Sequence, residues 1–245
     1  MVEAALAIGI FSMVAIAVVS VVSASTSGAQ NALETTITRE EIDAQAEALR
    51  FIHDSYINDL QSKNTQDNKY ANLWNKITEN SATGALSYNP TTCDELYSST
   101  GAINSNLSYN KGSSGSSATP FVINTRKLHG TNVSDIVIKS GSKNVFYPPV
   151  TYPRILYGST TATADDPLLE QATITSEDIA RVEGFYIVAS SGTHQVVSGD
   201  GPSNASTKTA YYDFYIRSCW MPTGSSRAST ISTVVRLYDP AAIQY

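Results

Sequence analysis

Residues 1–28, MVEAALAIGIFSMVAIAVVSVVSASTSG, open the chain with a long apolar stretch. Between residues 4 and 22 the only polar side chains are Ser12 and Ser20, and no charged residue occurs between Glu3 and Glu34. At about 1.5 Å per residue, residues 4–22 would form a helix of roughly 28 Å, close to the thickness of the hydrocarbon core of a bilayer. The stretch therefore predicts a helix that lies in a membrane or is buried among other helices.

Glu3 places a carboxylate at the start of this apolar stretch. Removing a carboxylate from water is costly unless a cation pairs with it, and the first basic residue along the chain is Arg39. The helix dipole stabilises an N-terminal carboxylate by about 0.3–1 kcal/mol, which is less than the full desolvation cost. We therefore expect the partner of Glu3 to come from another molecule.

The segment VEAALAIGI at residues 2–10 resembles the N-terminal core of type IV pilins. The resemblance implies that the helices bundle as the core of a filament and that Glu3 pairs with the N-terminal amine of a neighbouring subunit, carried by Met1 in this sequence. In the family the glutamate is usually fifth in the mature chain. Its third position here implies either different processing or two further residues and a leader before Met1.

The function implied by this resemblance is that of a structural subunit in a type IV pilus-like extracellular filament. The filament would be a homopolymer that supports surface adhesion or twitching motility. Each subunit would sit in the inner membrane and meet the pilus assembly machinery before assembly, with its head outside the bacterial cell. Two alternatives stay open, namely a minor pilin or pseudopilin of a secretion or DNA-uptake system, and a one-pass anchored extracellular binding protein or enzyme. A secretory signal peptide fits less well, because a basic n-region is missing and the apolar core is long.

Residues 29–62 are predicted to continue the helix in amphipathic form. Apolar side chains recur at steps of three and four residues and share one face, which we expect to pack on a sheet. They are Ile42, Ala46, Leu49, Ile52 or His53, Tyr56 and Leu60. Before this half, Ser, Thr and Gly at residues 23–28 are poor helix formers. We expect weakened or locally melted helix between residues 17 and 28, unless neighbouring groups satisfy the hydroxyls and the helix continues unbroken.

Residues 63–245 are predicted to form an α+β head, because a short helix at residues 70–77 is followed by strands. Residues 98–119, rich in Ser, Gly and Asn, are expected to form a surface loop. Runs of Val, Ile, Tyr and Phe predict strands at residues 121–124, 135–139, 155–157, 184–189, 210–218 and 230–238. In the last two strands alternate residues share a face: Ala210, Tyr212, Phe214 and Ile216 in one, and Ile231, Thr233, Val235 and Leu237 in the other. The predicted fold class is α+β, with a long N-terminal helix packed on an antiparallel sheet.

Cys93 and Cys219 are the two cysteines of the chain. In a head outside the cell they are expected to form a disulfide. Because 126 residues (219 minus 93) separate them, the bond could stabilise the head by about 4–5 kcal/mol in the chain-entropy model. The alternative is two separate buried thiols that pack as small apolar groups.

No pattern in the sequence predicts an enzyme, a cofactor or a metal site. His53, His129 and His194 lie far apart and match no zinc-ligand spacing. Residues 140–143 match the SxxK pattern without the companion motifs of acyl-enzymes, and a polar turn is the favoured interpretation. Residues 165–166 and 198–204 could offer oxygen ligands to calcium but lack EF-hand spacing. Three Asn-x-Ser sequons are expected to be ordinary polar loops; they begin at Asn106, Asn132 and Asn204.

Charge and aromatic content indicate which classes of partner the chain could bind. The 22 acidic residues outnumber the 16 Lys and Arg, and no basic run occurs, which argues against nucleic acid as the main partner. Four aromatic residues are candidates for an adhesive surface contact, because Tyr and Trp are favoured in binding patches. They are Tyr147, Tyr152, Tyr157 and Trp220. Packing in the core or between subunits is the favoured interpretation, since large aromatic side chains usually bury.

Overall fold

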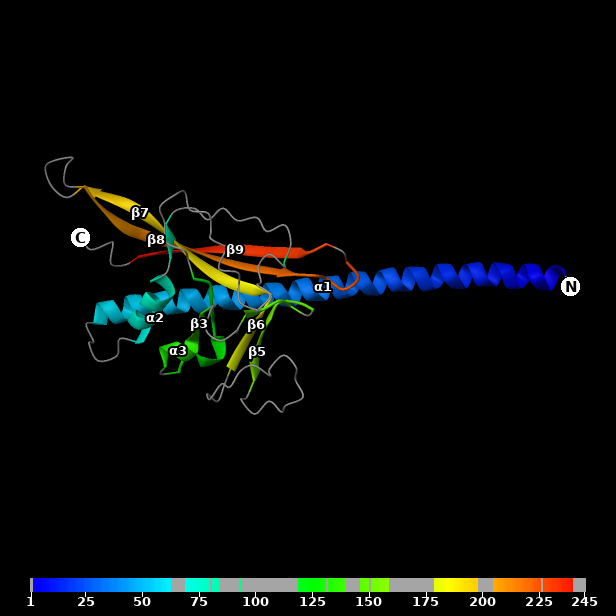
Figure 1. Ribbon diagram of the computed structural model, residues 1–245, viewed down its shortest axis with the longest axis horizontal. Helices are drawn as coiled ribbons and strands as arrows, with labels where there is room; N and C mark the ends of the chain where they lie inside the picture. The colour runs from blue at the N-terminus through cyan, green and yellow to red at the C-terminus, as the bar shows by residue number, and fades with distance from the viewer. Residues whose placement is uncertain are drawn as a thin grey trace.

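The computed structural model describes residues 2–62, 69–79, 81–83, 93, 119–130, 132–139, 146–149, 151–158, 179–197, 205–225 and 227–239. One long helix, α1 (Val2–Ser62), carries a head on its C-terminal half and projects from it at the N-terminal half (Figure 1). The α+β class and the helix-on-sheet arrangement predicted from the sequence are confirmed. The loop predicted at residues 98–119 lies, except for its last residue, outside the described residues.

The helix α1 runs without a break through the Ser/Thr-rich segment that precedes the amphipathic half. Within this segment the Thr26 hydroxyl donates a hydrogen bond of 2.9 Å to the carbonyl of Val22, one turn earlier. The prediction of locally melted helix between residues 17 and 28 is therefore wrong in this structure. The physical reason is that a hydroxyl bonded to a carbonyl of its own helix no longer competes for backbone groups in another conformation.

Within the described residues the head contains two sheets and two further α-helices, α2 (Lys69–Thr78) and α3 (Val133–Ile136). The main sheet has the antiparallel order β3-β2-β7-β8-β9, and β1 pairs with β7 in parallel. Its strands are β1 (Ala82–Thr83), β2 (Phe121–Ile123), β3 (Val137–Lys139), β7 (Phe185–Val197), β8 (Ala205–Trp220) and β9 (Ser229–Tyr238). The small sheet has the order β4-β6-β5 and consists of β4 (Phe146–Tyr147), β5 (Arg154–Gly158) and β6 (Ile179–Glu183). A short 3-10 helix, η2 (Thr125–Lys127), follows β2.

The main sheet has one face buried under α1 and α2 and a second face that is buried over β2 and β7 but exposed along β9. On one face Ile187, Phe214 and Val235 pack against α1 and α2 in a single core. On the other face Val188 and Val122 pack against the small sheet in a second core. In β2 and in residues 185–191 of β7 the side chains on both faces are buried, as expected for strands between two layers, whereas β8 carries Asp213 and Arg217 on its second face.

Most of the predicted core positions of α1 are confirmed. Five members of the predicted apolar face are buried: Ile42, Ala46, Leu49, Ile52 and Tyr56. The prediction that Leu60 belongs to the packed face is wrong, because its side chain is 48% exposed. Tyr56 is the last residue that α1 contributes to this core.

Strands occur near the segments predicted from the sequence, but several of them begin or end at other residues. The strand expected from residue 135 begins at Val137, because Asp135 and Ile136 belong to α3. The strands β7 and β8 extend well beyond the predicted segments as a long hairpin, with a register shift after Gly192. A side chain at Gly192 would place its Cβ 2.0 Å from the ring of Tyr211, so glycine leaves the space that this ring occupies.

Candidate assembly surface and helix–head junction

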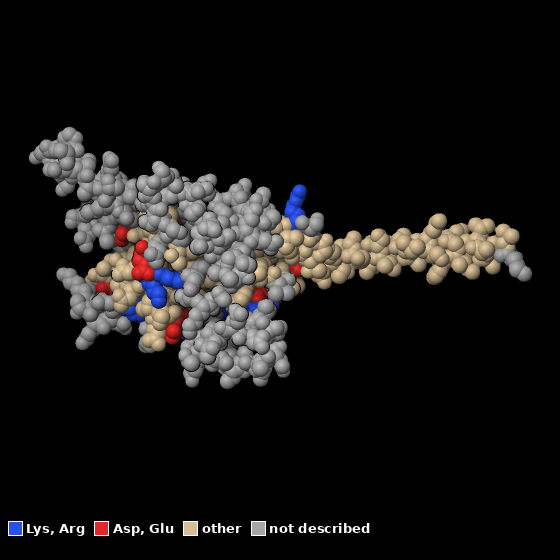
Figure 2. Space-filling view, in the orientation of Figure 1, with Lys and Arg blue, Asp and Glu red and all other residues tan. Residues whose placement is uncertain are grey.

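The N-terminal part of α1, residues 2–26, has no cover from the rest of the chain, and every one of these residues is exposed. We call this segment the bare half and residues 27–62 the covered half. Figure 2 shows the bare half as a rod with no charged atoms on the face in view. By length and composition, α1 is the one described helix able to cross a membrane. An apolar surface this large is stable in water only when lipid or other protein covers it.

Glu3 lies at the far end of the bare half and is exposed. The rest of the bare half carries no charge, so no cation of the same helix segment is available to it. Met1, which the pilin resemblance places at the partner site, lies outside the described residues. The geometry thus leaves Glu3 open to a group from another molecule.

The covered half begins at a junction built around Glu34, whose side chain is buried. The indole nitrogen of Trp220 donates to its Oε2 at 3.1 Å, and the hydroxyl of Thr223 donates to its Oε1 at 3.0 Å. Both donors lie where β8 ends, so Glu34 fixes the end of this strand to the helix. Buried carboxylate oxygens need such donors, because leaving them unsatisfied costs about 1–3 kcal/mol or more. Sequence reasoning missed this contact, although Glu34 is the residue that ends the charge-free stretch.

Two further polar side chains of α1 tie it to the sheet. Gln45 is fully buried and pairs with the backbone of Ile123 in both directions, donating at 2.8 Å and accepting at 2.9 Å. His53 bonds through Nε2 to the carbonyl of Tyr238 at 2.8 Å, at the end of β9. The Gln45 side chain takes the place of a neighbouring strand beside β2. It satisfies the amide and the carbonyl of Ile123, which would otherwise be buried without partners.

A disulfide joins Cys93 to Cys219, with a Cα–Cα separation of 5.5 Å. The predicted disulfide is therefore confirmed. Cys219 precedes Trp220 directly, so the bond holds the same strand end that Glu34 binds. The amide of Cys219 also donates to the carbonyl of Gly184, at 2.8 Å. The strand end at the junction is thus held within the head by a disulfide and held to α1 by hydrogen bonds.

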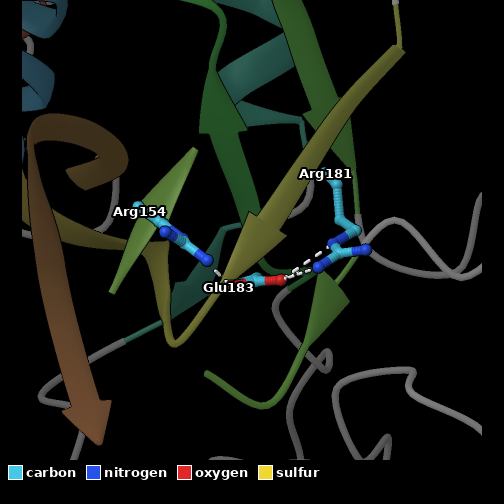
Figure 3. Close-up of polar contacts among 3 residues, drawn as sticks. All are labelled: Arg154, Arg181 and Glu183. Carbon is cyan, nitrogen blue, oxygen red and sulfur yellow. Dashed lines mark hydrogen bonds and ion pairs between the residues drawn. The ribbon is translucent and has the colours of Figure 1, made fainter. Parts of the chain in front are cut away.

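A buried ion cluster occupies the small sheet (Figure 3). Glu183 is fully buried and accepts hydrogen bonds from Arg154, at 3.3 Å, and from Arg181, at 2.8 Å. Arg154 and Tyr147 lie directly opposite Glu183 on the two neighbouring strands. The guanidinium of Arg181 stacks over the ring of Tyr147. Two cations around one carboxylate offset its desolvation, which favours a structural role.

A second polar cluster lies where α1 meets η2. Burial raises the pKa of the Glu41 carboxyl, and the nearby guanidinium of Arg126 partly offsets that rise. Arg126 lies 4.2 Å above the ring of Tyr157, whose hydroxyl is 3.3 Å from that of Thr125. Burial also raises the pKa of Tyr157. The cluster joins the helix to the small sheet.

The aromatic candidates for adhesion have packing roles in this structure. Trp220 is buried and bonded to Glu34, so it is no surface contact. Tyr147, Tyr152 and Tyr157 are partly buried, and each lies under an arginine. These contacts agree with the interpretation that large aromatic side chains serve packing.

The chemical candidates of the sequence do not come together. His53 contacts Trp74, and His129 contacts Phe51. Within the described part of the chain, no three His, Cys, Asp or Glu side chains gather as a metal site. The candidates at residues 140–143, 165–166 and 198–204, and the sequons at Asn106 and Asn204, lie outside the described residues, whereas Asn132 precedes α3.

The site so described defines an α+β protein with an exposed apolar helix and a head clamped to its second half. Comparison with family models, curated protein sequences and solved structures gives no match. The functional argument therefore rests on the geometry of α1 and on the sequence of its bare half.

Proposed function

We propose that this chain is a structural subunit of a type IV pilus-like extracellular filament, and that it polymerises through the bare half of α1. The observation that carries the proposal is that every residue from 2 to 26 is exposed on an unbroken helix, of which residues 4–22 are apolar all round. A helix of this kind requires lipid or other helices around it. Identical copies supply such helices when their bare halves pack together.

The proposed mechanism follows from the two halves of α1. Bare halves pack in the centre of the filament, and the heads lie outside because each is fixed to its own covered half through Glu34 and Gln45. Glu3 neutralises the N-terminal amine of a neighbouring subunit, which fixes the axial register of the copies. Polymerisation needs no cofactor, and the filament would serve surface adhesion or twitching motility.

Before assembly the bare half would span the inner membrane, with the head outside the cell. Residues 4–22 suffice for this by length. A minor pilin or a pseudopilin would use the same helix, and so would an anchored extracellular binding protein. Glu3 separates the last alternative from the others, because a simple tether gains nothing from a carboxylate beside its apolar stretch.

Cryo-electron microscopy of filaments sheared from cells tests the proposal. The expected map shows this chain repeated along the filament, identified by side-chain density, with residues 1–28 at the centre. If the filaments consist of another protein, this chain is at most a minor component of them. A chain found only as single subunits in the membrane would contradict polymerisation and favour the anchored binding protein.

Glu3→Ala is the sharpest variant for this proposal. Breaking a buried ion pair costs about 3–5 kcal/mol, so association of subunits should fall about a hundredfold or more while the protein still enters the membrane. The measurement is the amount of sheared filament per cell against the amount of subunit in the membrane fraction. Glu40→Ala, which removes an exposed carboxylate of the covered half, is the matched control. Wild-type filament yield from Glu3→Ala would overturn the pairing.

A further inference from the structure

The turn between β8 and β9 is the part of the head that reaches furthest along α1 towards its N-terminus (Figure 1). Its described residues are 221–225 and 227–228. The turn contacts the helix at Ser27, whose hydroxyl is 3.5 Å from the carbonyl oxygen of Thr223. A Cβ at Gly224, where φ is +76°, would lie 3.4 Å from the same hydroxyl. The turn therefore marks the point where the bare half ends and the covered half begins.

The distance from the apolar stretch to this turn is short. From Val22 to Ser27 the helix rises about 7.5 Å. The polar layer on each side of a bilayer is about 5–8 Å thick, the difference between a total of about 40–45 Å and a core of about 30 Å. When residues 4–22 fill the hydrocarbon core, the turn consequently lies at the level of the lipid headgroups.

The turn presents side chains suited to that level. Arg227 is exposed, and within the described residues its guanidinium has no carboxylate partner. Met221 is 46% exposed and offers a flexible apolar side chain. The backbone of the turn is held in place by its own bonds, since the amide of Arg227 donates to the Ser225 hydroxyl at 3.1 Å. Figure 2 shows basic atoms that project from the head where the bare helix leaves it.

We propose that the β8–β9 turn docks on the lipid surface when α1 spans the membrane, with Arg227 bound to headgroup phosphates. The proposal rests on the membrane-inserted stage of the proposed function. The position of the cation supports a lipid partner, because α1 carries no basic residue before Arg39. Arg227 therefore supplies a cation at a depth where α1 has none. Lipid phosphates attract such juxtamembrane cations.

Docking would hold the head upright on the membrane before assembly. The head is fixed to α1 at Glu34 and at Gln45, so contact of the turn with headgroups also fixes the depth of α1. Entry into a filament then requires that the turn leave the lipid surface.

Hydrogen exchange of the full chain in lipid nanodiscs tests this inference. The turn, residues 221–228, should exchange more slowly in phosphatidylglycerol than in phosphatidylcholine nanodiscs, while residues 232–238 of β9 exchange equally in both. Arg227→Gln should reduce the difference in the turn about fivefold. Arg39→Gln removes the same charge about 18 Å further along the helix than Ser27 and should leave the difference intact.

A nitroxide at Ala15→Cys separates the two possible failures, because it reports the depth of α1 in the same nanodiscs. A label in the hydrocarbon core combined with lipid-independent exchange of the turn overturns the docking proposal and leaves the spanning helix intact. A label in water overturns both. Equal effects of Arg227→Gln and Arg39→Gln would also overturn the assignment of the phosphate contact to Arg227.

Discussion

The two halves of α1 have the same backbone conformation and opposite surroundings. Ile16 in the bare half is 71% exposed, whereas Ile52 in the covered half is fully buried. The bare half is apolar on all sides, and the covered half is apolar on one face only. The difference teaches that the conformation of the helix does not reveal its role. The distribution of apolar side chains around the helix shows which half is completed by its own head and which by another molecule.

Polar side chains follow the same division. In the bare half the hydroxyls of Ser12 and Thr26 donate to carbonyls of their own helix. In the covered half Glu34, Gln45 and His53 bond to the sheet or to its ends. Hydrogen bonds therefore position the covered half on its own head. The bare half can bind other molecules mainly through apolar contacts, which have little directional preference. The following predictions test that division.

The largest effect on stability is expected from removal of the disulfide. Cys93→Ser with Cys219→Ser should lower the free energy of unfolding of the head by about 4–5 kcal/mol, because the bond closes a loop of 126 residues. The chain has two tryptophans, Trp74 and Trp220, and both lie in the head, so urea unfolding followed by Trp fluorescence in detergent reports on the head alone. Helicity by circular dichroism reports on the bare half.

The bare half should stay helical in detergent at urea concentrations that unfold this double variant. Reduction of the wild-type protein should reproduce the loss of stability. A bare half that unfolds together with the head would contradict the independence of the two halves.

A matched pair of isoleucine variants compares the halves directly. Ile52→Ala should cost about 2–5 kcal/mol, because it leaves a cavity in the core between α1 and the sheet. Ile16→Ala should change the stability of the head by less than about 0.5 kcal/mol, because its side chain touches no part of the head. Urea unfolding by Trp fluorescence measures both. Equal losses from the two variants would show that the bare half folds back on the head.

The apolar pattern predicted much of this fold from the sequence. Steps of three and four residues placed Ile42, Leu49 and Ile52 on the packing face of the helix. Alternation placed Phe214 and Val235 on the apolar faces of their strands, and the structure has those faces against α1. These predictions succeed because burial of apolar surface is the dominant favourable term in folding. The disulfide was predictable because two cysteines leave one pairing and the sequence led us to expect a head outside the cell.

The junction could not be predicted in the same way. Glu34 and Trp220 are 186 positions apart, and no local pattern connects a carboxylate to an indole at that separation. The same holds for Gln45 and Ile123, which are 78 positions apart. The unbroken helix at residues 17–28 was mispredicted because local propensity is a weak prior, and a hydroxyl such as that of Thr26 can bond to a carbonyl within the helix.

Gln45 offers the next test, since it is a polar side chain within the apolar face of the covered half. Gln45→Ala should cost about 1–3 kcal/mol, because it leaves the amide and carbonyl of Ile123 buried without partners. Gln30→Ala makes the same substitution at an exposed position of α1 and should be close to neutral. Equal stability of Gln45→Ala and the wild type would show that α1 packs on β2 without this bond.

The smallest effect is expected from the carboxyl of Glu41, where the covered half meets η2. Burial raises its folded-state pKa above the ordinary value of 4.5, and Arg126 offsets part of that rise. The folded state therefore keeps its proton to higher pH than the unfolded state, so stability falls as pH rises from the ordinary pKa through the raised one. Glu41→Gln cannot ionise and should reduce this fall, which urea unfolding at a series of pH values measures. Glu40→Gln, at an exposed position, should keep the wild-type slope, and a slope that Glu41→Gln leaves unchanged would show that the carboxyl is solvated in the folded protein.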